Sequence, residues 1–147
     1  MRSWAQRNPG EMVGDFRKLE VWRRARKLAT SVYRLTALLP ASERYGLTVQ
    51  MRRAVVSVAA NLAEGCGRMG DVELRRFVRI SLGSLAELEC ELLLAEELQF
   101  LESKASIPLV AEIGEIRAML QGLHDALPSG RVDMRPRPGL STLDSRL

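Results

Sequence analysis

The chain has 147 residues, of which 46% are hydrophobic and only 5% aromatic, enough for one domain with a mainly aliphatic core. Its formal net charge is +4, and all but three of its 22 basic residues are arginines. No apolar run approaches the roughly 18–20 residues that a membrane-spanning helix needs, and residues 1–15 lack the apolar segment of a secretory signal.

The first predicted helix covers residues 16–39 and should stop at Pro40, because the residue before a proline is disfavoured in the helical conformation. Apolar side chains fall on one broad arc at the helical repeat, and arginine and lysine cover the other side. Residues 15–39 contain seven basic and two acidic residues, a net charge of +5. The pattern predicts an amphipathic helix with a basic outer face.

The second predicted helix begins between residues 43 and 47 and ends near Glu64, because Gly65, Cys66 and Gly67 form a good C-terminal stop. Its segment 54–63 is apolar nearly all round. A helix of this kind must be buried on more than one side. In a bundle of only four helices, another subunit should cover the spare face, so we expect a homo-oligomer.

The third predicted helix covers residues 71–101, with Asp71 as its N-cap. Its first half is basic and its second half acidic: residues 84–104 contain six acidic residues and one basic residue, a net charge of −5. Gly83 lies in its middle and weakens the helix by about 1 kcal/mol relative to alanine unless close packing compensates. The fourth predicted helix starts near Pro108 and ends before Pro128, and its apolar spacing is typical of bundle packing.

Short connections make consecutive helices antiparallel neighbours. Residues 16–127 are therefore predicted to form an all-α, up-down-up-down four-helix bundle. Residues 1–15 are interpreted as a flexible N-terminal segment, and residues 128–147 as a disordered tail that contains arginine and proline. Cys66 and Cys90 fall within predicted helices, and we interpret them as two free, buried thiols of a cytoplasmic protein.

A polar stripe follows one side of the second predicted helix at spacings of three and four residues. A buried polar group without a partner costs roughly 1–3 kcal/mol, so this stripe must be solvated or hydrogen-bonded. It is either a strip that binds a ligand or RNA, or a polar seam that fixes register between helices or subunits, and we favour the seam. Its members are Gln50, Arg53, Ser57, Asn61 and Glu64.

Several short motifs occur in order along the chain. Residues 16–22 read FRKLEVW, residues 40–50 read PASERYGLTVQ, residues 61–65 read NLAEG and residues 84–88 read SLAEL, with Arg53-Ala54 between the second and third. This series resembles the four-helix bundle proteins first noticed as open reading frames within intervening sequences of bacterial large-subunit ribosomal RNA genes. The resemblance covers residues 16–101 by motif and extends to residue 127 by helix pattern. Lys18 departs from it, because relatives often carry a helix-capping aspartate there.

The resemblance implies a bundle that assembles into a ring-shaped homo-oligomer, typically of five subunits, without known enzymatic activity. Some relatives are accessory proteins of diversity-generating retroelements, in which a basic ring of bundles binds the reverse transcriptase and its RNA. The family as a whole has no settled function.

Basic residues on the first three predicted helices are the candidates for contacts with nucleic acid, because phosphate affinity needs several positive charges on one surface. In the alternative interpretation, this basic face is solvated and pairs with the acidic half of the third helix. The candidates are Arg23, Arg24, Lys27 and Arg34, together with Arg52, Arg53, Arg75, Arg76 and Arg79.

The residues offer little for catalysis. His124 is the only histidine and has no Glu or Cys at metal-ligand spacing. Cys66 would need a base such as His124 beside it to act as a nucleophile, and nothing in the sequence indicates this. Phosphate-loop, dinucleotide-binding and zinc motifs are missing from the sequence. We therefore expect no enzyme, no metal and no cofactor.

These observations predict a non-enzymatic, oligomeric RNA-binding accessory protein. Its expected partners are further copies of itself in a pentamer, RNA, and a retroelement reverse transcriptase, without a membrane. The alternatives are a structural or protein-interaction module without nucleic-acid binding, and a protein associated with ribosomal RNA. A metal- or small-molecule-binding bundle is disfavoured because the sequence lacks inward Glu-x-x-His pairs.

Overall fold

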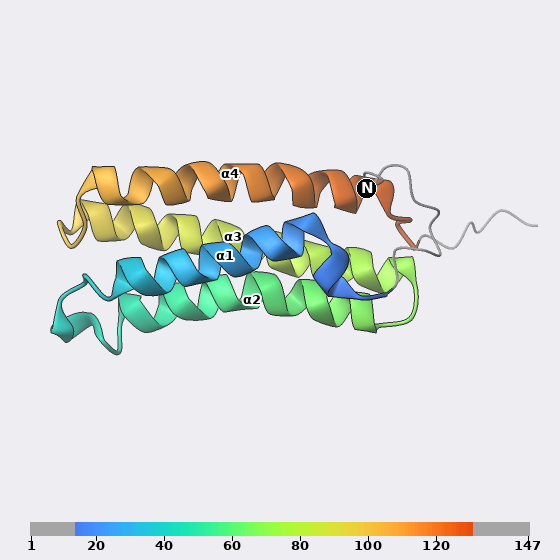
Figure 1. Ribbon diagram of the computed structural model, residues 1–147, viewed down its shortest axis with the longest axis horizontal. Coiled ribbons are helices and arrows are strands. Elements are labelled where there is room, and N and C mark those ends of the chain that lie inside the picture. Colours follow the sequence, from blue (N-terminus) through green and yellow to red (C-terminus); the bar gives the residue numbers. More distant parts are fainter. Residues whose placement is uncertain (1–13, 131–147) are drawn as a thin grey trace, which may run out of the picture.

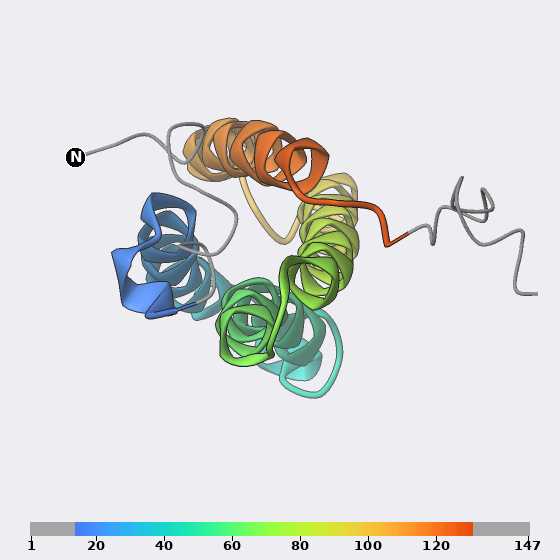
Figure 2. The ribbon, with the colours of Figure 1, turned by 90° about the vertical axis from the view of Figure 1, so that its right-hand side faces the viewer.

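The computed structural model describes residues 14–130, and these form four long helices packed side by side (Figure 1). The helices are α1 (Glu20–Thr36), α2 (Leu47–Gly67), α3 (Asp71–Glu97) and α4 (Ser103–Ala126). Seen from one end, they follow one another around the bundle, so α1 and α3 lie on a diagonal (Figure 2). The predicted all-α four-helix bundle is confirmed over these residues. Residues 1–13 and 131–147, which include most of the predicted flexible termini, lie outside the described residues.

Each helix contributes aliphatic side chains to one continuous core. Leu28 of α1, Leu62 of α2, Leu88 of α3 and Ile116 of α4 are all but completely buried. Burial of each such side chain stabilises the folded state by about 1.5–3 kcal/mol relative to leaving it in water. None of the helices in the described part of the chain is both long and apolar enough to span a membrane.

The start of α1 differs from the prediction. Residues Phe16–Lys18 form a separate 3₁₀ turn, capped by Asp15, whose carboxylate accepts a hydrogen bond from the backbone N–H of Arg17 at 3.0 Å. Leu19 has an extended backbone (φ −78°, ψ 123°) and so separates this turn from the helix that follows. Asp15 thus provides the carboxylate cap that Lys18 cannot, and it caps the turn rather than α1.

The end of α1 also falls earlier than expected. The α-helix stops at Thr36, and the backbone N–H groups of Leu38 and Leu39 bond three residues back in a tighter turn before Pro40. The effect of the proline therefore extends over the last helical turn and not only over the residue before it.

Helix α2 continues through the glycines that were expected to end it. Gly65 and Cys66 are buried, and the helix ends where the backbone N–H of Arg68 bonds to Glu64 O. A Cβ atom on Gly65 would lie 2.8 Å from Phe77 Cβ of α3. Gly65 therefore allows two helices to approach closely, which is a different role from that of a C-terminal stop.

Two further boundaries were wrong. Helix α3 begins at Asp71, but its N-cap is Gly70, whose φ of 106° suits glycine. The helix ends at Glu97, four residues before the predicted end at residue 101. Helix α4 begins at Ser103 and includes Pro108. The turn before the proline is held by the buried Ser106, whose hydroxyl bonds to Ser103 O at 3.0 Å and also to the Glu96 carboxylate of α3.

Two of the helical glycines, Gly65 and Gly83, should respond oppositely to replacement by alanine. Gly65→Ala forces a Cβ against Phe77 and should lower the free energy of unfolding by roughly 1–3 kcal/mol. Gly83 is exposed, with open space where a Cβ would stand, so Gly83→Ala should raise the free energy of unfolding by about 0.5–1 kcal/mol. Urea unfolding followed by circular dichroism measures both. A rise in the free energy of unfolding of Gly65→Ala would contradict the close packing at Gly65.

Candidate nucleic-acid interface

The outward face of α1 carries two short stripes. Arg26 and Tyr33 form one, and Lys27 and Arg34 form the other; the members of each are seven residues apart, which is about two helical turns. All four side chains are exposed. Within residues 14–130, Lys27 and Arg34 form no ion pair, and the Arg26 guanidinium lies 5.3 Å from the centre of the Trp22 ring. These cations are available to an anionic partner.

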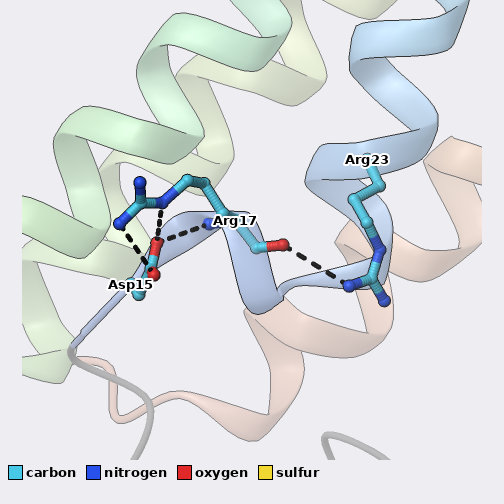
Figure 3. Close-up of polar contacts among 3 residues, drawn as sticks. All are labelled: Asp15, Arg17 and Arg23. Atoms are coloured by element: carbon cyan, nitrogen blue, oxygen red, sulfur yellow. Dashed lines mark hydrogen bonds and ion pairs between the residues drawn. The ribbon is translucent and has the colours of Figure 1, made fainter.

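Arg23 is committed to contacts at the start of α1. Its Nη2 lies 2.8 Å from Glu20 Oε2, and its Nη1 donates a hydrogen bond to Arg17 O at 3.4 Å (Figure 3). Figure 3 also shows the Arg17 guanidinium paired with Asp15, at 2.7 Å between Nε and Oδ1. The hydrogen bond from Arg17 lowers the pKa of the Asp15 carboxyl. Arg23 thus ties the 3₁₀ turn to α1.

Arg24 is on the edge of α1 that contacts α4 and not on the outward face. Its Nε and Nη2 donate to Glu112 Oε1 and Oε2, both at 2.8 Å, in a partly buried bidentate pair. These hydrogen bonds raise the pKa of Arg24 above its already high value. Within the described residues of one chain, α1 pairs with α4 and not with the acidic half of α3, where Glu89 pairs with Arg117 of α4.

A groove of about 470 Å³ lies where α1 meets α2. Its most ordered side chain is Arg52, whose Nε donates to Thr36 Oγ1 at 2.9 Å and whose guanidinium lies 4.5 Å above the centre of the Tyr33 ring. Arg53 lies beside it, exposed and without an ion pair in residues 14–130. The groove is lined by Tyr33, Val49, Arg52, Arg53, Val56 and Ser57.

The three candidates on α3 are not brought to this face. Arg75 Nε donates to His124 O at 3.2 Å, Arg76 pairs with Glu73 at 3.2 Å, and Arg79 is exposed. Because α3 is diagonal to α1, these arginines lie across the bundle from the stripes on α1 (Figure 2). The nine candidates therefore do not form one surface within a single chain.

The predicted polar stripe on α2 is divided by the structure. At its centre, Ser57 Oγ lies 2.8 Å from Ser84 Oγ of α3, and Asn61 Nδ2 donates to Ser57 O at 2.8 Å. Below them, Ser81 Oγ of α3 donates to Val58 O at 3.0 Å. The Ser57–Ser84 and Ser81–Val58 bonds cross from α2 to α3 of the same subunit, whereas the Asn61 bond stays within α2. Of the five residues of the stripe, Ser57 is the one bonded to a side chain of a neighbouring helix within the described residues, and the role of the stripe as a register-fixing seam stays a prediction.

The remaining members of the stripe face solvent. Gln50, Arg53 and Glu64 are exposed, and Glu64 pairs with Arg68 at 2.9 Å. Such an exposed pair one helical turn apart contributes only about 0.3–0.5 kcal/mol. Arg53, which the sequence placed both in the stripe and among the nucleic-acid candidates, is in position only for the second role.

A buried carboxyl on α3 was not singled out from the sequence. Glu91 is 4% exposed, and neither of its carboxyl oxygens has a hydrogen-bond partner in the described part of the chain. Burial raises the pKa of Glu91 to about 7, with a further contribution from the negative charge of Glu87 one turn earlier. The spacing of four residues from Glu87 was visible in the sequence, but the burial depends on how α2 and α3 pack.

The two cysteines and the histidine differ in burial and in contacts. Cys66 is 3% exposed, and burial raises the pKa of its thiol to about 11, which leaves it protonated at neutral pH. The prediction that both thiols are buried was wrong for Cys90, which is exposed. His124 lies in the last turn of α4, with Nδ1 3.0 Å from Asp125 Oδ1. Residues 14–130 contain no group of three side chains placed to hold a metal ion.

Tyr33 and Arg26 were missed as candidates for an interface. The sequence did contain a signal: Arg26 and Tyr33 precede Lys27 and Arg34 by one residue each, so the four share an outward face on any helix. The position of Arg52 over Tyr33 could not be seen before the packing of α1 against α2 was known.

Comparison with known proteins places the fold in a family. The model of the 23S rRNA-intervening sequence protein family matches residues 17–122, which reach into all four helices. Among solved structures, the chain is similar to a protein of unknown function from the S23 ribosomal protein family of Bacteroides thetaiotaomicron, with a TM-score of 0.66 and 18% identity over 71% of this chain and 97% of that one. Identity this low shows a shared fold. The comparison with curated proteins found no match. The chain belongs to the 23S rRNA-intervening sequence protein family.

Proposed function

We propose that this protein is a non-enzymatic, oligomeric RNA-binding accessory protein, with the outward faces of α1 and α2 as its RNA interface. The observation that carries the proposal is the presence on these faces of cations that have no carboxylate partner within residues 14–130, among them Lys27, Arg34 and Arg53. Unneutralised arginine and lysine side chains on one surface are the electrostatic footprint of a phosphate-binding protein. The family name, which refers to intervening sequences of 23S rRNA, agrees with an RNA partner.

Self-association would bring several copies of this RNA interface together in one particle. Within one chain, Ala60 of α2 is exposed, and Ile80 of α3 is 40% exposed. We call these two residues the assembly face, and a second copy is its expected occupant, because the segment 54–63 that carries Ala60 is apolar nearly all round. A closed ring would present each basic face once per subunit, so that several weak phosphate contacts act together.

The assembly face gives a direct test of self-association. Light scattering on the purified protein should give the mass of a pentamer, whereas Ala60→Glu should give a monomer with unchanged helicity, because Ala60 is exposed and its replacement leaves the core intact. The matched control is Ala118→Glu, on the exposed side of α4, which should keep the wild-type mass. A stable monomer of the wild-type protein at micromolar concentration would contradict the proposal.

The protein partner follows from the resemblance to accessory proteins of diversity-generating retroelements. A reverse transcriptase is therefore the first partner to test, and a neighbouring reverse transcriptase gene with template and variable repeats would support it. A gene located inside a 23S rRNA gene would instead make ribosomal RNA the first RNA to test.

A second candidate function is a protein-interaction module that needs no RNA. It is favoured by the outer side of α3, where Leu93 and Leu94 are about half exposed and lie beside the exposed Cys90 and Glu97. Apolar side chains flanked by carboxylates suit a basic amphipathic helix of another protein. In this case the cations of α1 would serve solubility alone.

RNA binding separates the two candidates. Fluorescence anisotropy with a labelled hairpin RNA should show binding at low salt that weakens steeply as salt is added. Three phosphate contacts for each chain correspond to a slope of about −3 in a plot of log affinity against log salt, and a ring multiplies the contacts. No binding at low salt would favour the interaction module.

A further inference from the structure

The groove between α1 and α2 presents a flat, cationic wall beside an apolar floor. Tyr33 keeps 45% of its surface exposed although the Arg52 guanidinium lies over its ring, and Val56, also 45% exposed, forms part of the floor. The groove, of about 470 Å³, is open to solvent. A flat ligand with a negative charge suits such a surface.

Arg52 is held in place without losing its charge. Its Nε donates to Thr36 Oγ1 and its Nη2 donates to Tyr33 O at 3.3 Å, while Thr36 Oγ1 itself donates to Val32 O at 2.7 Å. Each of these acceptors is neutral, so no carboxylate within residues 14–130 cancels the guanidinium charge. An arginine that is fixed before the ligand arrives loses little freedom on binding.

Arg53 adds a second positive charge to the lining of the groove. It is exposed, forms no ion pair among the described residues, and follows Arg52 directly on α2. A nucleotide has the complementary arrangement, with a planar base that stacks on aromatic rings or guanidinium planes and a phosphate that pairs with a cation.

We propose that this groove binds an unpaired nucleotide of an RNA strand, with the base stacked on the wall of Tyr33 and Arg52 and the phosphate at Arg53. The inference rests on the proposed RNA-binding function and specifies the part of the RNA that is recognised. Lys27 and Arg34 contact the phosphates of any RNA, paired or unpaired, whereas the groove accepts only a base that is free of a partner strand. The protein therefore distinguishes looped RNA from a continuous duplex.

The test compares two labelled RNAs in the same anisotropy assay: a hairpin with a loop of unpaired adenosines, and a blunt duplex with the sequence of its stem. Tyr33→Leu keeps an apolar side chain but removes the ring, and it should weaken hairpin binding about tenfold, the effect of losing one base stack, while duplex binding stays unchanged. Tyr33→Trp keeps a ring for stacking and should bind the hairpin at least as well as the wild type. Arg52→Lys keeps the charge without the flat guanidinium and should also weaken binding of the hairpin alone.

Four outcomes would overturn the inference. Equal hairpin affinity of Tyr33→Leu and wild type, or equal losses for hairpin and duplex, contradicts the nucleotide site while leaving the RNA-binding function intact. A wild-type protein that binds neither RNA contradicts the proposed function and the inference together. Because the groove and the assembly face share helix α2, light scattering on each variant checks the mass; a loss of hairpin binding that occurs only with a change of mass counts against the nucleotide site.

Discussion

Replacing Glu91 by glutamine should raise the free energy of unfolding by about 3 kcal/mol at pH 8 and change it little at pH 4. The Glu91 carboxyl is 4% exposed and has no hydrogen-bond partner among the described residues, and its pKa is raised from 4.5 to about 7. A carboxyl whose pKa is higher in the folded state binds its proton more tightly there. Its contribution to stability is therefore complete below pH 4.5 and is lost as the pH rises through 7.

Glutamine removes this dependence because it has nearly the same shape and cannot ionise. Within the described residues, the charged group that adds to the effect of burial is the carboxylate of Glu87, one turn earlier on α3. The matched control is Glu97→Gln, on the exposed side of α3, which should leave the stability unchanged at both pH values. Urea unfolding of the three proteins at pH 4 and pH 8 measures the effect. A Glu91→Gln protein that is less stable than wild type at pH 8 would show that the carboxylate has a cationic partner.

The sequence predicted the four helices, their order and their antiparallel arrangement because these depend on features that act locally. The apolar repeat of α4 and the amphipathic pattern of α1 are each contained within the sequence of the helix itself, so they can be recognised without knowing the neighbouring segments. The boundaries failed where a tertiary contact overrides a local rule. Gly65 is typical of a helix end, but here it lies within α2 and allows the close approach of α3. Pro108 is typical of a first helical turn, but here α4 already has a turn before it, which the hydroxyl of Ser106 stabilises by bonding to Ser103 O.

The candidate interface was predicted only in part for the same reason. The sequence identified Lys27 and Arg34 as outward-facing cations, and the structure leaves them so. It could not identify the partner of Arg24, because Glu112 is distant in sequence and meets α1 only through the packing of α4. Nor could it divide the polar stripe of α2, in which Asn61 bonds within the subunit while Arg53 faces solvent.

The second large effect concerns RNA. Reversing the charge of two outward cations in the variant Lys27→Glu/Arg34→Glu should lower the affinity for structured RNA by roughly 100-fold or more, because two phosphate contacts are lost and two repulsive charges take their place. Both side chains are exposed and unpaired within residues 14–130, so the thermal stability should stay close to that of wild type. Arg24 is left unchanged, since a glutamate there would face Glu112 and destabilise the bundle.

The matched control is Arg79→Glu/Lys104→Glu. It shifts the formal net charge of the chain by the same amount, from +4 to 0, but alters α3 and the start of α4 instead of the outward face of α1. Arg79 is exposed, and the pair between Lys104 and Glu102 is at the surface, so this variant should also fold. The comparison separates the position of the charges from their total.

One measurement tests the RNA interface most directly: anisotropy titration of the same hairpin RNA at one low salt concentration with wild type, Lys27→Glu/Arg34→Glu and Arg79→Glu/Lys104→Glu. We expect tight binding by the wild type, a loss of about 100-fold for the α1 variant, and a loss of less than about tenfold for the control, in which only the overall charge has changed. Equal losses in the two variants, or binding by the α1 variant as tight as that of wild type, would contradict an RNA interface on α1.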